Sequence, residues 1–353
     1  MSAVGAVTYR PGNDADLDGC IRVWRAAVDA YQAPIGQPPL PAETGPLRRH
    51  LVHMTTTDPD RFWVAESTQA CASTDTAEGA WAEPAAGPET GGPGILGFCV
   101  ATVRDGLWYL GMLFVLPEAQ GRGIGTALLD RAQAGRDAPG GGPAVPCPDA
   151  PLGSGIHTWG MATDTAQPIS NALYARRGMT PRLPVWRLVG EPRRWSALPP
   201  LPPSLEAVPF EAIAANGHEG PRRLAEAVNA VDRAVIGITH PADHEYLRRD
   251  GRAGFLVRER EGRVLGYVYG SGVGRLGPVA AHDPALLPSL LGVAIRAVPS
   301  FGAVAAWVPG TADAALRGLL DAGLRLDRFP AILCWSRPDH PFERYLPINL
   351  AMI

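Results

Sequence analysis

The sequence predicts two consecutive α/β domains, each with an α+β mixed sheet of parallel and antiparallel strands. Three observations support this. The chain has 353 residues, more than one core of ordinary size contains. A proline-rich segment, Glu191–Ser204, interrupts it, and the order of strand and helix patterns before this segment recurs after it. We therefore expect a first domain at residues 1–190, a linker at 191–204 and a second domain at 205–353.

The composition narrows the class of protein. Hydrophobic residues make up 46% and charged residues 19%, and the formal net charge is −3. This charge gives no indication of nucleic acid or of an anionic membrane as a partner. The cysteines are scattered without a CxxC pair, so we expect neither disulfides nor a metal site. They are Cys20, Cys71, Cys99, Cys147 and Cys334. With no signal peptide and no long apolar run, the expected location is cytoplasmic.

The first half begins with a strand at residues 6–10 and a helix over 13–31, for which Asn13 or Asp14 is the expected N-cap. The segment 61–67 alternates as a half-buried strand. Two apolar strands, 95–103 and 107–116, are joined by the turn sequence Arg104-Asp105-Gly106. Helices follow at 126–136 and 169–178, with strands at 156–163 and 185–190. Small, polar and glycine-rich composition indicates insertions at 67–94 and 137–155.

The second half repeats this order. Its expected strands are 205–210, a hairpin over 254–270, then 275–282, 302–308 and 329–336; its expected helices are 221–235, 284–298 and 312–323. The first half is longer mainly because of the insertion at 137–155. An internal duplication therefore explains both halves.

A glycine-rich turn stands between an apolar strand and a helix in the first half. It reads "PEAQGRGIGTALL", Pro117–Leu129. Three alternate glycines at a helix start let successive N–H groups face one concavity, where the helix dipole favours an anion. A tight turn without a ligand is the plainer alternative. A P-loop would need a following lysine, and a dinucleotide-binding turn would follow its strand directly with a different glycine spacing.

The wider context is more specific. "LFVLPEAQGRGIGTALL" (Leu113–Leu129) resembles the acyl-CoA signature V-x-P-x-x-(R/Q)-G-x-G-(I/A)-G of the GNAT superfamily of N-acetyltransferases. "QPISNALYARRGM" (Gln167–Met179) is similar to a second segment of that family, N-x-x-(A/S)-x-x-LY-x-x-x-GF. The resemblance implies acetyl-CoA as cofactor and direct transfer of an acetyl group to a primary amine. The amine would belong to a small molecule or a peptide.

The resemblance also assigns residues. It implies that the backbone of Leu113, Phe114 and Val115 pairs with the pantetheine arm of CoA. It further implies that the pyrophosphate lies on the N–H groups of the turn, where glycines have no Cβ to block the approach. These are the N–H groups of Gln120, Gly121, Arg122, Gly123, Ile124, Gly125 and Thr126. The Arg122 side chain is a further phosphate contact or a solvated loop arginine.

Two residues of the second segment are candidates for the chemistry. Tyr174 matches the family tyrosine near the CoA sulfur, where a phenol can protonate the departing thiolate. Asn171 precedes it by three residues and is expected to hydrogen-bond the cofactor. Gln167 stands where the family has an asparagine, which changes the reach of that amide.

No general base is evident, because the strand 107–116 contains no carboxylate. Asp105, Glu66 and His157 are alternatives, as are a water chain and an amine that is already neutral. We expect the acceptor between the domains, lined by Trp108, Tyr109 and Trp159 unless these aromatic residues belong to the core. The C-terminal segment 346–353 could cover the site.

The second half lacks the glycine signature. Its equivalent turn, "VAAHDPALLPSLL" (279–291), has His282 and Asp283 near the places where glutamine and glycine should be, and Pro284 opens the helix. Leu319 or Leu320 stands near the tyrosine position. We expect a degenerate, non-catalytic copy, as in a tandem-GNAT chain that is a monomeric pseudo-dimer or a homodimer. A non-catalytic acyl-CoA-binding sensor or interaction module is the alternative function. A third alternative is an enzyme that binds NAD or ATP in place of CoA.

Overall fold

The computed structural model describes residues 6–37, 40–67, 94–134, 155–298, 302–327, 329–338 and 342–353. The expected insertions at 67–94 and 137–155 lie almost entirely outside these residues. Contacts group the chain into two compact units. Unit 1 comprises Met1–Ala101 and Met112–Ala144, and unit 2 comprises Thr102–Gly111 and Val145–Ile353. Each unit is described by itself.

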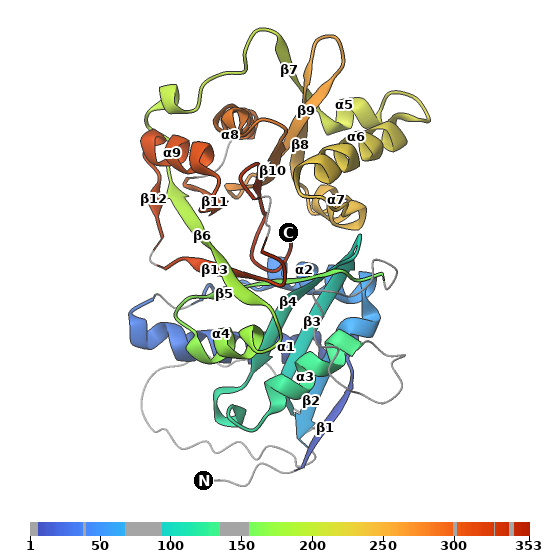
Figure 1. Ribbon diagram of the computed structural model, residues 1–353, viewed down its shortest axis with the longest axis vertical. Coiled ribbons are helices and arrows are strands. Elements are labelled where there is room, and N and C mark those ends of the chain that lie inside the picture. Colours follow the sequence, from blue (N-terminus) through green and yellow to red (C-terminus); the bar gives the residue numbers. More distant parts are fainter. Residues whose placement is uncertain are drawn as a thin grey trace. The chain divides into compact units, whose positions relative to one another are not determined.

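The order of elements repeats along the chain (Figure 1). The first copy comprises β1 (Val7–Pro11), α1 (Leu17–Gln32), α2 (Gly45–Thr57), β2 (Phe62–Ser67), β3 (Ile95–Arg104), β4 (Leu107–Val115), α3 (Ile124–Ala134), β5 (Thr158–Asp164), α4 (Pro168–Ala175) and β6 (Thr180–Gly190). The second comprises β7 (Leu205–Pro209), α5 (Phe210–Ala214), α6 (Gly220–Val235), α7 (Pro241–Arg249), β8 (Ala253–Glu259), β9 (Val264–Gly270), β10 (Arg275–Ala281), α8 (Leu287–Ala297), β11 (Val304–Pro309), α9 (Asp313–Ala322) and β13 (Ala331–Trp335). Apart from α5, the two series match, which confirms the predicted tandem fold. Two short strands, β12 (Arg325–Leu326) and β14 (Tyr345–Leu346), complete the second half.

The helices α2 and α7 were absent from the sequence prediction. Both are polar overall: α2 buries only His50, Leu51, Met54 and Thr55, and α7 buries Asp243, His244 and Leu247. Because hydrophobic periodicity is the main helix signal, a helix that buries polar side chains gives too weak a pattern to be recognised.

In unit 1 the strands lie in the order β1-β2-β3-β4. β2 pairs antiparallel with both β1 and β3. The chain enters α1 through a short 3₁₀ helix, Asp14–Asp16, whose N-cap is Asn13, one of the two predicted caps. The Asn13 side chain accepts from the Ala15 N–H, and Asp16 accepts from the Asn13 N–H. Arg10 on β1 forms ion pairs with Asp16 and Glu66, which fixes the start of α1 to this edge of the sheet.

In unit 2 the strands lie in the order β4-β5-β13-β6-β11-β10-β9-β8-β7. The last strand of each copy pairs with the penultimate strand of the other. β6 is antiparallel to β11, β13 is antiparallel to β5, and β6 and β13 pair with each other (Figure 1). This exchange explains why β5, α4 and β6 of the first copy belong to unit 2. The domain limits 1–190 and 205–353 stay a prediction.

Side chains alternate across this sheet, as strand geometry requires. On β9, Tyr267 and Tyr269 belong to one core cluster with residues of α6 and α7, whereas Val268 belongs to the other with residues of α8 and α9. The proline-rich segment 191–204 packs on the α8–α9 side. Its Leu198 is fully buried, and the Leu198 carbonyl accepts a hydrogen bond from Arg296 Nη2.

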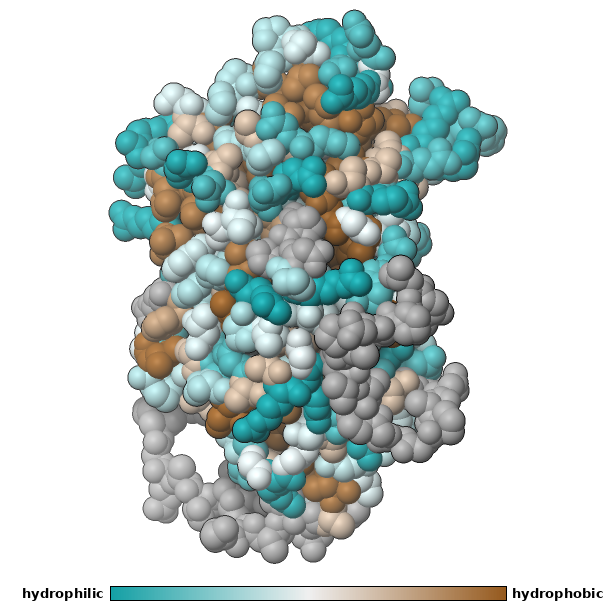
Figure 2. All heavy atoms as spheres, in the orientation of Figure 1, coloured by the Kyte–Doolittle hydropathy of each residue, from teal (hydrophilic) through white to brown (hydrophobic). Residues whose placement is uncertain are grey.

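The surface drawn in Figure 2 is mostly hydrophilic, with smaller hydrophobic areas between. No helix among the described residues combines the length and the apolar character that a membrane span requires. Cys20, Cys99 and Cys334 are buried free thiols, while Cys71 and Cys147 lie outside the described residues. Burial raises the pKa of Cys334 to about 12, which makes this thiol unreactive near neutral pH.

The strand exchange can be tested at Gly160, which lies opposite Trp335 where β5 pairs with β13. A Cβ on Gly160 would overlap the Trp335 ring. Gly160→Ala should therefore lower the free energy of unfolding by about 1–3 kcal/mol, measured by urea denaturation. Gly272→Ala is the matched control, because nothing lies within 4 Å of the Cβ position there. Equal stabilities of these two variants would contradict the pairing.

Candidate functional site

The glycine turn of unit 1 is held at both ends by hydrogen bonds. After β4, the Leu116 N–H donates to the Leu96 carbonyl (2.8 Å), which keeps the exit of β4 against β3. A 3₁₀ turn at Pro117–Ala119 follows. The Gln120 side chain then reaches back, and its Nε2 donates to the Val115 carbonyl (3.0 Å). The turn therefore has a defined start before the glycines are reached.

Two of the three glycines are required by the backbone. Gly121 and Gly123 have φ angles of +75° and +78°, a region that residues with a Cβ rarely adopt. No atom of the residues that the structure describes lies within 4 Å of the Cβ position at either residue. Gly125 is different, because it lies in the first turn of α3 and a Cβ there would make an ordinary 3.7 Å contact with Val115 Cγ2. The turn therefore leaves open space over Gly121 and Gly123.

The start of α3 supplies donors to this space. The Gly123 carbonyl accepts from the Ala127 N–H (3.0 Å), so α3 begins here. The N–H groups in the first turn of a helix have no intrahelical acceptor, and the helix dipole places positive charge beside them. Ile124 is buried and anchors the helix, while Arg122 and Thr126 are exposed. Together these features form a cradle for an anion, and they fit the pyrophosphate of CoA.

The strand before the turn extends beyond its parallel pairing. β4 pairs with β5 from Leu107 to Leu110, opposite Thr158–Met161, but β4 continues to Val115. The predicted residues Leu113, Phe114 and Val115 lie in this extension and are half-buried. A Cβ on Gly97 of β3 would lie 2.9 Å from the Phe114 carbonyl oxygen, so the two backbones approach closely there. The extension has a backbone edge that the β4–β5 pairing does not use.

Tyr174 and Asn171 lie on α4 in unit 2. Tyr174 is 4% exposed, and its carbonyl accepts from the N–H groups of Arg177 and Met179 where the helix ends. The Asn171 amide nitrogen donates to the carbonyls of Asp164 (3.1 Å) and Gln167 (2.8 Å). Asn171 thus holds the start of α4 to the end of β5, and its cofactor role would have to use Oδ1.

Each side chain considered as an alternative general base has an ion-pair or hydrogen-bond partner within its own unit. Glu66 is paired with Arg10. Asp105 accepts from both the N–H and the hydroxyl of Thr239 (3.1 Å each). His157 Nδ1 lies 3.0 Å from the Thr158 hydroxyl. Each side chain therefore has a local role that explains its position.

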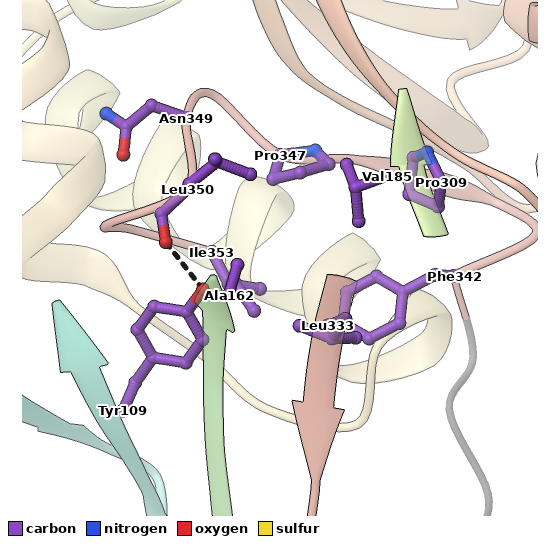
Figure 3. A pocket seen from close by; sticks show the side chains of 10 residues that line it. All are labelled: Tyr109, Ala162, Val185, Pro309, Leu333, Phe342, Pro347, Asn349, Leu350 and Ile353. Carbon is purple, nitrogen blue, oxygen red and sulfur yellow. Dashed lines mark hydrogen bonds between the residues drawn. The ribbon is translucent and has the colours of Figure 1, made fainter. Parts of the chain in front are cut away.

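The aromatic residues that were candidates for lining the acceptor site are core residues. Trp108, Tyr109 and Trp159 are 0%, 2% and 7% exposed. The Tyr109 hydroxyl donates to the Leu350 carbonyl (2.7 Å), and burial raises the pKa of this phenol. Figure 3 shows this bond in a small apolar pocket where the C-terminal residues Leu350 and Ile353 lie near Ala162 of β5. The C-terminal segment is therefore packed on β4 and β5 within unit 2.

In the second copy, residues of the chain itself occupy the places that correspond to the strand edge and the open turn of the first copy. The parallel pairing of β10 with β11 covers Arg275–Leu276 only. Beyond it, β14 of the C-terminal segment pairs with β10, with Val279 opposite Leu346 and Ala280 opposite Tyr345. The backbone edge that is available on β4 is thus occupied on β10. Sequence analysis missed β14, because a two-residue strand has no periodicity to detect.

The corresponding turn of the second copy contains a carboxylate side chain, that of Asp283. Asp283 Oδ1 accepts from the Ala285 N–H (2.9 Å) at the start of the helical segment that leads to α8. Leu319, near the position of Tyr174 in the other copy, is fully buried in the core. The expected degeneracy of this copy therefore has a physical basis at three separate places.

A model of a known protein family matches part of this chain. Residues 58–178 match the family model described as an acetyltransferase (GNAT) domain. The chain contains a GNAT domain. This segment includes both motifs on which the resemblance was based. The GNAT domain supports acyl-CoA-dependent N-acyltransferase activity in general.

Solved structures show that the GNAT fold continues through the second half. A protein of Pyrococcus horikoshii matches with a TM-score of 0.65 and 13% identity, covering 100% of this chain and 98% of that one. A GCN5-related N-acetyltransferase of Sphaerobacter thermophilus matches with a TM-score of 0.56 and 16% identity, covering 98% of each chain. One of Anabaena variabilis matches with 0.51 and 11%, covering 93% of this chain and 72% of that one. No curated protein matches the sequence.

The geometry of the turn predicts unequal roles for its glycines. Gly121→Ala and Gly123→Ala should each lower the free energy of unfolding by about 1–2 kcal/mol, because the positive φ is costly for a residue with a Cβ. Both should weaken CoA binding, measured by calorimetry. Gly125→Ala is the matched control and should change neither quantity much. A Gly125→Ala variant that lost binding while the other two retained it would contradict this assignment.

Proposed function

We propose that this protein is a cytoplasmic acetyl-CoA-dependent N-acetyltransferase whose first copy is catalytic. The observation that carries the proposal is the open glycine turn at the start of α3, directly after a strand whose edge extends beyond its parallel pairing. The acceptor is a primary amine of a small molecule or a peptide.

The roles of the chain's own residues follow from their chemistry. When bound, acetyl-CoA supplies an activated thioester carbonyl for attack by the amine. The N–H groups from Gly121 to Thr126 would neutralise the pyrophosphate, whereas the Gln120 N–H, also predicted for this role, donates to the Pro117 carbonyl (3.3 Å). The backbone of residues 113–115 would align the pantetheine arm. Asn171 would accept a hydrogen bond through Oδ1. The Tyr174 hydroxyl would donate a proton to the departing sulfur.

The role of Tyr174 can be separated from binding. Tyr174→Phe should lower kcat by about 10²–10⁴-fold, the usual contribution of a positioned acid, and leave the affinity for acetyl-CoA nearly unchanged. Thiol release across a panel of amines, together with calorimetry, measures both. Tyr9→Phe removes a hydroxyl from β1 in unit 1 and serves as control. Full activity of Tyr174→Phe would exclude the acid role.

A second candidate function is an acyl-CoA-binding sensor without turnover. It is favoured by the absence of a carboxylate from β4 and by the local partners of Glu66, Asp105 and His157. The same assay distinguishes it from the enzyme. If acetyl-CoA binds and no amine in the panel releases thiol, the sensor is the better interpretation.

The contrast between the copies predicts one acetyl-CoA per chain. In the second copy β14 occupies the strand edge and the Asp283 carboxylate caps the helix start. Titration calorimetry should therefore give a stoichiometry of one. Gly123→Asp, which places a carboxylate in the first cradle, should abolish binding because of charge repulsion with the pyrophosphate. Two equivalents bound, or one that persists in Gly123→Asp, would contradict the assignment.

A further inference from the structure

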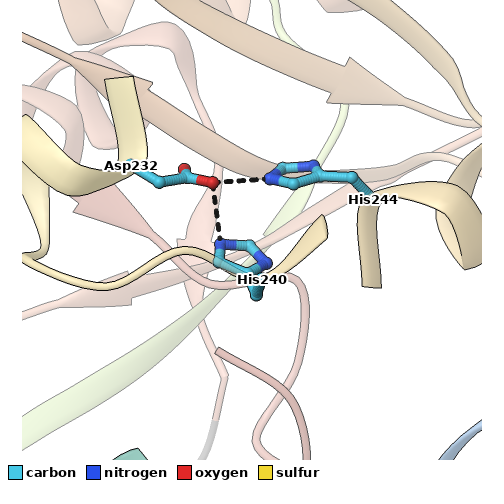
Figure 4. Close-up of side chains that lie close together, drawn as sticks. All are labelled: Asp232, His240 and His244. Carbon is cyan, nitrogen blue, oxygen red and sulfur yellow. Dashed lines mark hydrogen bonds and ion pairs between the residues drawn. The ribbon is translucent and has the colours of Figure 1, made fainter. Parts of the chain in front are cut away.

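Three buried side chains of unit 2 that are not among the residues assigned to acyl-CoA converge on one point. Asp232 lies near the end of α6, His240 is the N-cap of α7, and His244 lies one turn into α7 (Figure 4). Their exposed fractions are 0%, 1% and 5%. Asp232 Oδ2 lies 2.8 Å from His244 Nε2 and 3.4 Å from His240 Nε2. One ligand atom from each residue lies within 4.8 Å of the others.

The outward-facing atoms of the three residues have partners that fix their orientation. The Tyr267 hydroxyl donates to Asp232 Oδ1 (2.6 Å), and the Tyr269 hydroxyl lies 2.9 Å from His244 Nδ1. His240 Nδ1 faces the carboxylate of Asp243 at 3.9 Å. Arg104 in turn holds Asp243 through two hydrogen bonds of 2.9 Å. Such outer partners are typical of histidines and carboxylates that bind a metal ion, because they set the tautomer and direct the lone pair inward.

The two carboxylates in and beside the cluster differ in their charged partners. Arg104 neutralises Asp243, but Asp232 forms its charge contacts among the described residues with the two imidazoles only. A buried carboxylate needs a positive partner.

The two histidine rings lie next to the Asp232 carboxylate (Figure 4). They are stacked with centroids 4.4 Å apart, and the Nε2 atom of each faces Asp232 Oδ2. Neither ring nitrogen of His240 makes a hydrogen bond within the described part of the chain, and the same holds for the hydroxyl of the fully buried Tyr345, whose ring packs edge-on against His240. A cation bound by both Nε2 atoms and Oδ2 would use these lone pairs together.

We propose that Asp232 Oδ2, His240 Nε2 and His244 Nε2 bind a Zn²⁺ ion. Two imidazoles and a carboxylate are a ligand set that suits Zn²⁺. His240, the N-cap of α7, stands four residues before His244 in the same helix. The 3.4 Å separation of Oδ2 from His240 Nε2 agrees with ligands about 2.0–2.1 Å from one tetrahedral ion, whereas the 2.8 Å hydrogen bond between Oδ2 and His244 Nε2 would have to lengthen when the ion binds. The ion joins α6 to α7 in the copy that lacks the glycine turn. The expectation of no metal site, which was based on the scattered cysteines, differs from this proposal.

The test is metal binding to the full-length protein, measured without any activity assay. Purified protein stripped with a chelator is titrated with Zn²⁺ and, separately, with Co²⁺, whose visible absorption reports tetrahedral coordination. We expect one equivalent of either ion, and an increase in melting temperature that the chelator reverses. His240→Gln and His244→Gln should each weaken binding by at least about 100-fold, and the outer-partner variant Tyr269→Phe by about 10-fold. His218→Gln, at an exposed position, is the matched control and should bind like the parent.

Each outcome decides the question. If the parent protein, folded by circular dichroism, retains less than one tenth of an equivalent of Zn²⁺ and gives no Co²⁺ absorption beyond that of the free ion, the cluster is a metal-free hydrogen-bond network and the proposal is wrong. Binding that survives in both histidine variants would place the ion elsewhere and also overturn it. Should the glutamine variants fail to fold, the Co²⁺ spectrum of the parent and the affinity of Tyr269→Phe still decide. None of these measurements depends on acyl-CoA binding.

Discussion

The exchange of the last strands between the two copies is the constraint on which unit 2 depends. β6 obtains its backbone hydrogen bonds from β11 and β13, and β13 obtains its own from β5 and β6. Backbone groups buried in a sheet must be paired, so neither strand can leave without exposing the edge of the other copy. Gly160 permits this pairing, because only a residue without a side chain leaves room for Trp335. The two copies thus follow one another in the chain, and the last strand of each pairs with a strand of the other.

This interlocking lets the two copies diverge in chemistry while they share a scaffold. The turn after β4 and the turn after β10 lie outside the exchanged strands β6 and β13. The first has kept two residues with positive φ and an open space above them. The second has replaced that space with Asp283 and the β10 edge with β14. In both copies the backbone groups of the strand edge and of the turn need hydrogen-bond partners. In the second copy the protein itself supplies them, and in our proposal acyl-CoA supplies them in the first.

The second copy also differs in how its interior is stabilised. Its α6 and α7 bury charged and polar groups that the sheet face opposite them must satisfy, and Tyr267 and Tyr269 of β9 do so. Their alternation with Val268 is what directs both hydroxyls to the same side. The copy that lacks the glycine turn thus holds a polar cluster in its core.

The sequence by itself determined the tandem fold, the order of elements and the position of the glycine turn. These features depend on local signals: apolar periodicity, turn residues and a motif whose glycines are needed for positive φ at Gly121 and Gly123. It also indicated that Asp283 stands where a glycine would be needed. These predictions succeeded because each concerns residues that are neighbours in the chain.

Only the tertiary structure decided which residues from distant segments meet. The pairing of β13 with β5, the use of β14 on β10 and the hydrogen bond from Tyr109 to the C-terminal segment all join residues more than 60 positions apart. The contact of Asp243 with Arg104 is of the same kind, and Asp232 and Tyr267 meet although 35 positions separate them. A periodic pattern shows that a side chain is buried, but its partner is set by the sheet order, which no local segment encodes.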